Sequence, residues 1–177
     1  HQSVREDIAR SFCEIEQARL LTLMAADQMD RYGNKVAKDL IAGIRQGSRR
    51  AIGRAITAVE SGGTTGREVL SAIYPHTGGA IRLGLTGPPG VGKSTLISAL
   101  VANRRAAGQQ VAVVSVDPSS PFTHGAVLGD RIRLVDHFTD PGVFIRSMAS
   151  RGQLGGVSEG TAGAMAVLDA AGFDVVI

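Results

Sequence analysis

Apolar residues recur at helical spacing through the first part of the chain, with polar residues between them. Residues 4–31 are predicted to form a long amphipathic helix, whose apolar positions are Val4, Ile8, Phe12, Ile15, Leu23, Met24 and Met29. Three shorter helices are expected after it, over residues 35–45, 48–61 and 65–73. Ser48 is placed to cap the second of these three at its N-terminus. The chain therefore starts with a helical region.

The pattern changes after residue 80, where short apolar runs alternate with helical stretches. We expect strands over residues 81–86, 111–116, 143–146 and 174–177, and helices over residues 94–107 and 158–171. The run at 111–116 is rich in valine, which is typical of a strand buried on both faces of a parallel sheet. Strands that alternate with helices in this way predict βαβ units and an α/β fold with a mostly parallel sheet.

Composition narrows the class of protein further. The chain has 177 residues, of which 44% are hydrophobic and 20% charged, as in ordinary folded domains. A net charge of +3 is too small to indicate a nucleic-acid-binding surface. One cysteine excludes an intramolecular disulfide. We find no secretory signal and no apolar stretch of membrane-spanning length, so no membrane association and a cytoplasmic location are expected.

A glycine-rich turn joins the expected strand at 81–86 to the following helix. Residues 87–94 read Gly-Pro-Pro-Gly-Val-Gly-Lys-Ser and match the phosphate-binding P-loop pattern at every fixed position. Glycines let the backbone N–H groups wrap a phosphate, and the helix N-terminus adds unpaired donors. Lys93 is expected to reach the β- and γ-phosphates and to stabilise charge during hydrolysis. The predicted nucleotide-binding residues are Gly87, Pro88, Pro89, Gly90, Val91, Gly92, Lys93, Ser94 and Thr95.

Three oxygen-bearing side chains are candidates to hold Mg²⁺ beside this loop. The hydroxyl of Ser94 is the ligand that the P-loop pattern itself supplies. Asp117 follows the buried run at 111–116 and so is expected at the carboxyl edge of the sheet, where open α/β sheets bind ligands. It could therefore hold the metal, or it could instead cap the Pro-Ser-Ser turn that follows it. Asp130 follows Gly129 in a loop that could sense the γ-phosphate, and with Lys93 it is a candidate catalytic residue. Alternatively, Asp130 could cap a helix at its N-terminus.

Beyond the P-loop, longer stretches resemble one family. They are residues 49–60, 74–78, 116–123, 125–133, 137–148 and 151–156. From about residue 43 to residue 177 the chain resembles the MeaB/ArgK family of P-loop GTPases, whose vertebrate relatives are the methylmalonic aciduria type A proteins. The resemblance implies a Mg²⁺-dependent GTPase that acts as a chaperone for an adenosylcobalamin-dependent acyl-CoA mutase of the methylmalonyl-CoA mutase type. It also implies a homodimer.

The family pattern continues past Ile177 into an acidic switch loop and a guanine-reading motif, so we expect a truncated P-loop domain. The preference for GTP over ATP therefore rests on the resemblance. One alternative is a P-loop kinase of the amino-acid transport-associated type, with Arg131, Arg133 and Arg146 as candidates for an arginine-bearing lid. The other alternative is an inactive nucleotide-binding module.

The front of the chain carries a different resemblance. Residues 8–22, 25–30 and 33–37 look like helices from the C-terminal bundle of acyl-CoA dehydrogenases, a likeness that covers about residues 2–41. No flavin-binding motif or catalytic carboxylate is found there, so dehydrogenase activity is not expected. We therefore divide the chain into a dehydrogenase-like helical segment at 1–42, a helical extension of the GTPase at 43–80, and a P-loop domain at 81–177.

Overall fold

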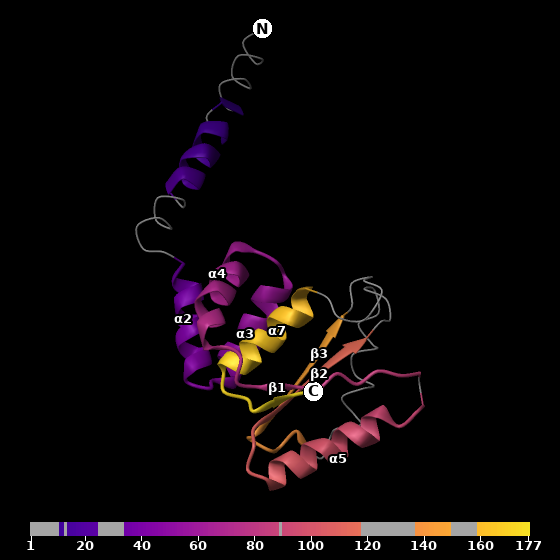
Figure 1. The fold of residues 1–177 in the computed structure, drawn as a ribbon. Helices are drawn as coiled ribbons and strands as arrows, with labels where there is room; N and C mark the ends of the chain where they lie inside the picture. The colour runs from indigo at the N-terminus through magenta and orange to yellow at the C-terminus, as the bar shows by residue number, and fades with distance from the viewer. Residues whose placement is uncertain (1–10, 13, 25–33, 89, 118–136, 150–158) are drawn as a thin grey trace. The chain divides into compact units, whose positions relative to one another are not determined.

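The computed structural model describes residues 11–12, 14–24, 34–88, 90–117, 137–149 and 159–177. The chain divides into two units, His1–Lys35 and Val36–Ile177, and we describe each by itself. In the first unit residues 11–12 and 14–24 are helical, drawn in indigo in Figure 1. This agrees with the predicted helix over the part that is described. Its large apolar side chains are exposed, and those of Phe12, Ile15 and Leu21 are each more than 60% exposed.

The second unit begins with helices α2 (Lys35–Arg45), α3 (Arg49–Glu60) and α4 (Thr64–Ile73). Ser48 caps α3, because its side-chain oxygen accepts a hydrogen bond from the Ala51 N–H at 3.5 Å. The helices α3 and α4 pack closely because residue 66 is glycine: a Cβ there would clash with the Ala58 carbonyl. All three helices confirm the sequence-based expectation to within one residue or two.

Four parallel strands follow, in the spatial order β1-β4-β2-β3. Their bounds are β1 (Ile81–Arg82), β2 (Val111–Asp117), β3 (Val143–Ala149) and β4 (Val175–Val176). The short 3-10 helix η1 (Tyr74–His76) precedes β1, and the connections carry α5 (Lys93–Ala106) and α7 (Glu159–Ala170). The strand predicted at 81–86 is shorter than expected, because its pairing with β4 extends only to the Leu83 N–H. The strand predicted at 143–146 is longer.

Alternation along the strands divides the apolar side chains between the two faces of the sheet. Val111, Val113, Val143 and Val175 pack with Val101 of α5 on one face. The opposite face contributes Ala112, Phe144, Met148 and Val176 to a larger core with α2, α3, α4 and α7. Figure 1 shows the resulting layers, with α5 on one side of the sheet and the helical layer on the other.

The helices α2, α3 and α4 are therefore part of the same core as the sheet. The boundary proposed at residue 42 falls inside α2, whose Leu40 and Ile44 are buried in one cluster with Ile52 and Ile56 of α3. None of the helices formed by the described residues is both long enough and apolar enough to span a membrane.

Candidate functional site

The glycine-rich loop leaves β1 at the carboxyl edge of the sheet and leads directly into α5. Three of its glycines have positive φ: Gly87 at 152°, Gly90 at 78° and Gly92 at 94°. Gly92 is the N-cap of α5 in the left-handed conformation, which a residue with a Cβ adopts only at a free-energy penalty. The turn therefore requires glycine at these positions, and it leaves the first N–H groups of α5 directed toward the loop.

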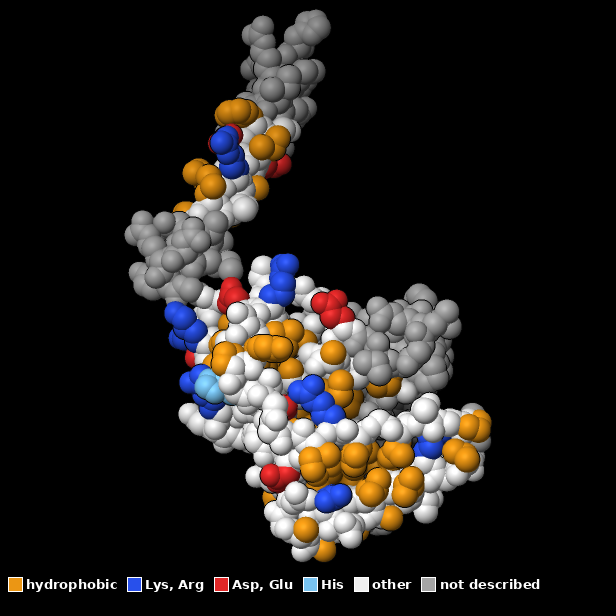
Figure 2. Space-filling view, viewed as in Figure 1, with side chains coloured by type: hydrophobic (Ala, Val, Ile, Leu, Met, Phe, Trp, Pro, Cys, Tyr) orange, Lys and Arg blue, Asp and Glu red, His pale blue; other side chains and the backbone are white. Residues whose placement is uncertain are grey.

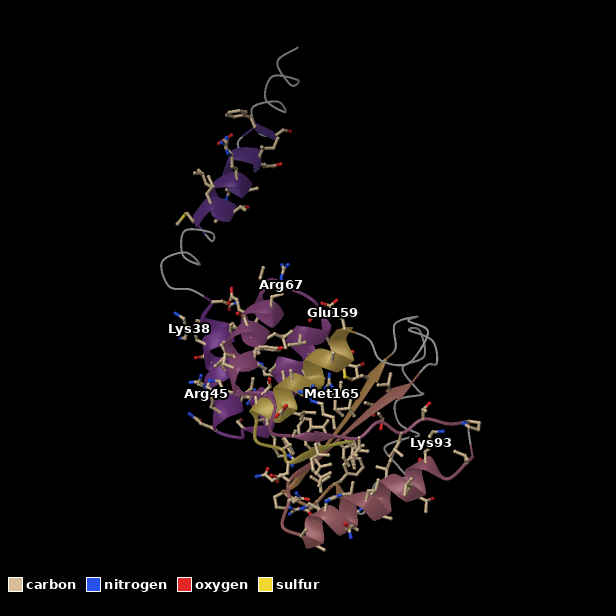
Figure 3. The ribbon with its side chains drawn as sticks, in the orientation of Figure 1. Lys38, Arg45, Arg67, Lys93, Glu159 and Met165 are labelled. Carbon is tan, nitrogen blue, oxygen red and sulfur yellow. The ribbon has the colours of Figure 1, made fainter. Side chains whose placement is uncertain are left out.

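Lys93, the first residue of α5, folds back over the loop. Its Nζ donates to the Gly87 carbonyl at 2.6 Å and to the Pro88 carbonyl at 2.9 Å. Figure 3 shows Lys93 at the N-terminal end of α5. Ser94 is half-buried beside it, whereas Thr95 and Val91 are exposed. These two partners of the ammonium group among the described residues are neutral carbonyl oxygens, so its charge remains available to an anion that enters the loop.

The candidate metal ligands are only partly described. Asp117 ends β2 at the same edge of the sheet as the loop, as its position in the sequence predicts, but its side chain lies outside the described residues. Because β4 lies between β1 and β2, and neighbouring strands are about 4.8 Å apart, Asp117 is about 10 Å from the line of β1. Asp130 and Pro89 also lie outside the described residues. Within the described part of the chain, no group of three or more His, Cys, Asp and Glu could hold a metal ion.

A buried carboxylate that the sequence reading missed holds the segment before β1. Asp169, near the end of α7, has a side chain only 1% exposed. It accepts hydrogen bonds from the backbone N–H groups of Gly78, Gly79 and Ala80 at 2.8–3.1 Å, and from Arg82 Nη2 at 2.9 Å. Burial raises the pKa of Asp169, but these donors outweigh it and the pKa lies below its ordinary value. An acidic residue within the mostly apolar sequence of α7 is the pattern from which a buried, hydrogen-bonded Asp169 could have been predicted.

A second ion pair fixes the far end of α5 to the start of β3. The Asp140 carboxylate accepts from Arg105 Nε at 2.8 Å and from Arg105 Nη2 at 2.9 Å, and it also accepts from the Gly142 N–H. The Arg105 guanidinium lowers the pKa of Asp140 and the carboxylate in turn raises the pKa of Arg105. The C-terminal end of α5, the helix that follows the P-loop, is therefore held to the start of β3.

The structure changes the interpretation of Arg146, a candidate for the lid of a kinase. Arg146 lies on the helical face of the sheet, where its Nη2 donates to Thr57 Oγ1 at 3.1 Å and is 3.5 Å from Glu60 Oε2. It is therefore not part of a lid over the loop in this structure. Arg131 and Arg133, the other two lid candidates, lie outside the described residues.

A parallel sheet with a glycine-rich phosphate loop between its first strand and a helix defines a P-loop nucleotide-binding domain of the α/β class. The solved structure described as "Crystal structure of LAO/AO transport system kinase" supports this fold, with a TM-score of 0.62 and 34% identity over 81% of this chain and 43% of that one. The family model "Methylmalonyl Co-A mutase-associated GTPase MeaB" matches residues 52–177. The chain belongs to that family.

Similar proteins from other organisms are named as GTPases. A putative GTPase of Pyrococcus abyssi is 54% identical over 138 residues, which is 78% of this chain and 43% of the relative. The GTPase ArgK of Escherichia coli is 44% identical over 138 residues, 76% of this chain and 42% of ArgK. The chain thus spans less than half the length of these relatives.

Proposed function

We propose that this chain binds GTP together with Mg²⁺, as part of a GTPase that acts as a chaperone for an adenosylcobalamin-dependent acyl-CoA mutase. The observation that carries the proposal is the loop after β1, where glycines with positive φ and the Lys93 ammonium face the same space. The family description supports GTP as the nucleotide and a mutase as the partner. A homodimer is part of the same proposal.

Each residue type at the loop is suited to binding a nucleoside triphosphate. The backbone N–H groups of the loop and of the first turn of α5 would bind phosphate oxygens, aided by the positive end of the helix dipole. Lys93 would exchange its two carbonyl partners for the β- and γ-phosphates. The hydroxyl of Ser94, with Asp117 and Asp130, would hold Mg²⁺, which neutralises phosphate charge when bound. Asp130 is also proposed to act in catalysis.

A P-loop kinase is the second candidate, and the likeness to a solved transport system kinase is the observation that favours it. A kinase requires an acceptor site and a cationic group that closes over the phosphates. Because Arg146 is already bonded to Thr57 and lies beside Glu60, that group would have to come from another residue. The inactive nucleotide-binding module remains the third candidate.

Displacement of a fluorescent GTP analogue by GTP, GDP and ATP tests the nucleotide part of the proposal. GTP is expected to displace the analogue from the wild-type protein in the presence of Mg²⁺. Lys93→Ala should bind GTP more weakly, and Lys38→Ala is its matched control, because Lys38 lies on α2 in the helical layer (Figure 3). The Lys38→Ala protein should bind as the wild type does, and binding by neither protein would contradict the proposal.

Surface-immobilised protein and a purified adenosylcobalamin-dependent acyl-CoA mutase test the partner. We expect mutase binding whose dissociation rate differs between the GTP-bound and GDP-bound states. A protein that binds GTP but no mutase under either condition would contradict the chaperone role and leave the nucleotide site intact. Phosphate release measured with and without a candidate phosphoryl acceptor separates the GTPase from the kinase.

A further inference from the structure

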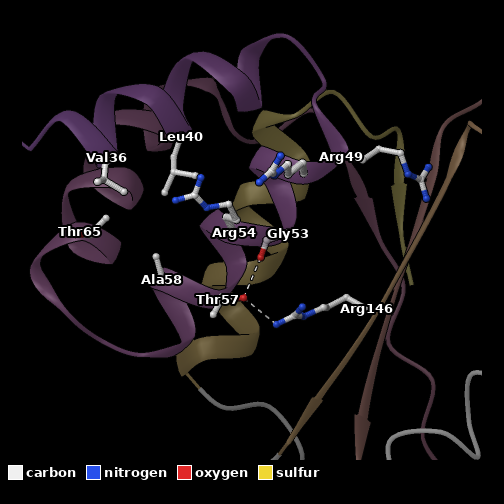
Figure 4. A pocket seen from close by; sticks show the side chains of 10 residues that line it. Val36, Leu40, Arg49, Gly53, Arg54, Thr57, Ala58, Thr65 and Arg146 are labelled. Atoms are coloured by element: carbon white, nitrogen blue, oxygen red, sulfur yellow. Dashed lines mark hydrogen bonds between the residues drawn. The ribbon is translucent and has the colours of Figure 1, made fainter.

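The helical layer contains a groove that is separate from the P-loop. It has a volume of about 500 Å³ and lies over α2, α3 and α4, next to β3 (Figure 4). We call it the arginine groove, after Arg49, Arg50, Arg54 and Arg146, which line it above an apolar floor that includes Leu40 and Ala58. No carboxylate belongs to the described residues that line it. The described lining of the groove is therefore positively charged. Figure 2 shows basic side chains in blue beside apolar side chains in orange on one face of the second unit.

Two of the four arginines already have partners within the protein. Arg49 donates to the Pro141 carbonyl at 3.2 Å, and its guanidinium lies 5.5 Å from the centre of the Phe144 ring. Arg146 is bonded to Thr57 and paired with Glu60, as described above, although its buried Nε has no hydrogen-bond partner among the described residues. These contacts fix two walls of the groove.

The remaining two arginines have their charges uncompensated. Arg50 and Arg54 are exposed and one turn apart on α3, and no ion pair found among the described residues includes either of them. Like charges at this spacing repel each other. The first turn of α3 also carries no acidic residue, where one would offset the helix dipole. Both guanidinium groups are therefore available to an external anion.

Gly53 lies between these two arginines, at a position where the fold itself does not require glycine. It is inside α3, where glycine is unfavourable relative to other residues, and its φ is not positive. A Cβ added to Gly53 would meet no atom within 4 Å. The bare backbone instead opens the wall of the groove, which permits the close approach of another molecule.

The shape of the surface indicates a long ligand. A second hollow of about 320 Å³ shares Val36, Leu40, Arg50 and Arg54 with the groove, and one carboxylate, that of Asp39, belongs to its described lining. No aromatic side chain among the described residues lines either hollow, so nucleic-acid bases would find no ring on which to stack. Exposed guanidinium groups around an apolar floor instead match carboxylates that flank an apolar side chain.

We propose that the arginine groove docks an acidic segment of a partner protein, with an apolar side chain on the floor formed by Leu40 and Ala58 and carboxylates on Arg50 and Arg54. The segment passes over Gly53, where the missing Cβ leaves room for it. Because the groove lies on the face of the sheet opposite α5, this docking does not require a nucleotide at the P-loop.

A fluorescein-labelled peptide in which glutamates flank a pair of leucines tests the proposal by fluorescence anisotropy. A peptide with glutamine in place of each glutamate should bind the wild-type protein at least about tenfold more weakly. Exposed ion pairs are worth up to about fivefold in affinity each, so Arg50→Gln with Arg54→Gln should weaken acidic-peptide binding by about tenfold. Arg67→Gln removes one positive charge from α4, outside the groove, and should leave peptide affinity unchanged (Figure 3).

A further variant separates docking from folding. Gly53→Gln fills the groove with a long side chain and replaces glycine by a better helix former, so peptide affinity should fall while Tm does not. Equal peptide affinity in the wild type and the double variant would overturn the proposal, as would the absence of any measurable peptide binding. Tighter binding of a single-stranded RNA oligonucleotide than of the acidic peptide would assign the groove to nucleic acid instead.

Discussion

Replacing Asp169 with Asn keeps the size of the side chain but removes its charge and one of its two acceptor oxygens. In the structure Oδ1 accepts from Gly79 and Ala80, and Oδ2 accepts from Gly78 and Arg82. The least disruptive asparagine keeps its carbonyl oxygen at the Oδ1 position. Its amide nitrogen then faces two donors, the Gly78 N–H and the Arg82 guanidinium. The variant therefore removes the partner of the Gly78 N–H, a hydrogen bond that is part-buried in the structure.

The magnitude follows from these contacts. A hydrogen bond to a charged group contributes about 1.5–3 kcal/mol, and the exposed Gly78 can recover part of this by bonding to water. The Arg82 side chain is 47% exposed, so it can also turn to water and adds little. We expect the free energy of unfolding to fall by about 1–3 kcal/mol. Urea denaturation followed by far-UV circular dichroism measures this, since the chain has no tryptophan.

Lowering the pH should reduce the difference in the free energy of unfolding between the wild type and Asp169→Asn. The pKa of Asp169 is lower in the folded state than its ordinary value of 3.8, so the ionised form stabilises the fold. This contribution is present above about pH 4 and is lost as the pH falls through the folded-state pKa. Asp174→Asn is the matched control: Asp174 is exposed and accepts one backbone hydrogen bond, from the Gln110 N–H at 2.7 Å. If Asp169→Asn destabilised the protein no more than this control, the anchoring role of Asp169 would be refuted.

Three further predictions concern other parts of the second unit. Gly92→Ala should lower the free energy of unfolding by about 1–2 kcal/mol and weaken nucleotide binding, because φ at this position is 94°. Gly84→Ala, where φ is not positive, should change neither quantity appreciably in the same urea and nucleotide titrations. Asp140→Asn should lower Tm at neutral pH and should flatten the loss of Tm in acid, because the Arg105 guanidinium holds the pKa of Asp140 below 3.8. Limited proteolysis with mass spectrometry should leave a fragment that begins near Val36, since Leu40 and Ile44 of α2 are buried; a stable fragment that begins after α2 would contradict the packing described.

Local patterns were sufficient to predict most elements of the described fold. Serine at position 48 and glycine at position 108, which has φ of 79°, act through neighbouring backbone groups, so the bounds of α3 and α5 could be predicted closely. The valine-rich run at 111–116 likewise predicted a strand buried on both faces. The extent of β1 could not be predicted in this way, because it depends on how far β4 pairs with it.

The candidate site was predictable only where the motif is contiguous. The P-loop residues form one short turn, and the structure brings Gly87 and Lys93 together as the motif implies. Asp169 contacts residues about ninety positions earlier, at sequence separations of 89–91, and no local pattern encodes such a contact. Arg146 was a candidate for the lid of the kinase alternative, but strand alternation places it on the opposite face of the sheet from α5.

Calorimetric titration of GTP with Mg²⁺ into the wild-type protein and into Lys93→Ala tests the central claim most directly. Lys93 donates two hydrogen bonds within the loop and has no substitute donor of like charge among the described residues of the motif. Loss of a charge-assisted bond of about 1.5–3 kcal/mol predicts that the variant binds GTP about tenfold to a hundredfold more weakly. Equal affinity in the two proteins, with both still folded by circular dichroism, would show that the loop after β1 is not the nucleotide site.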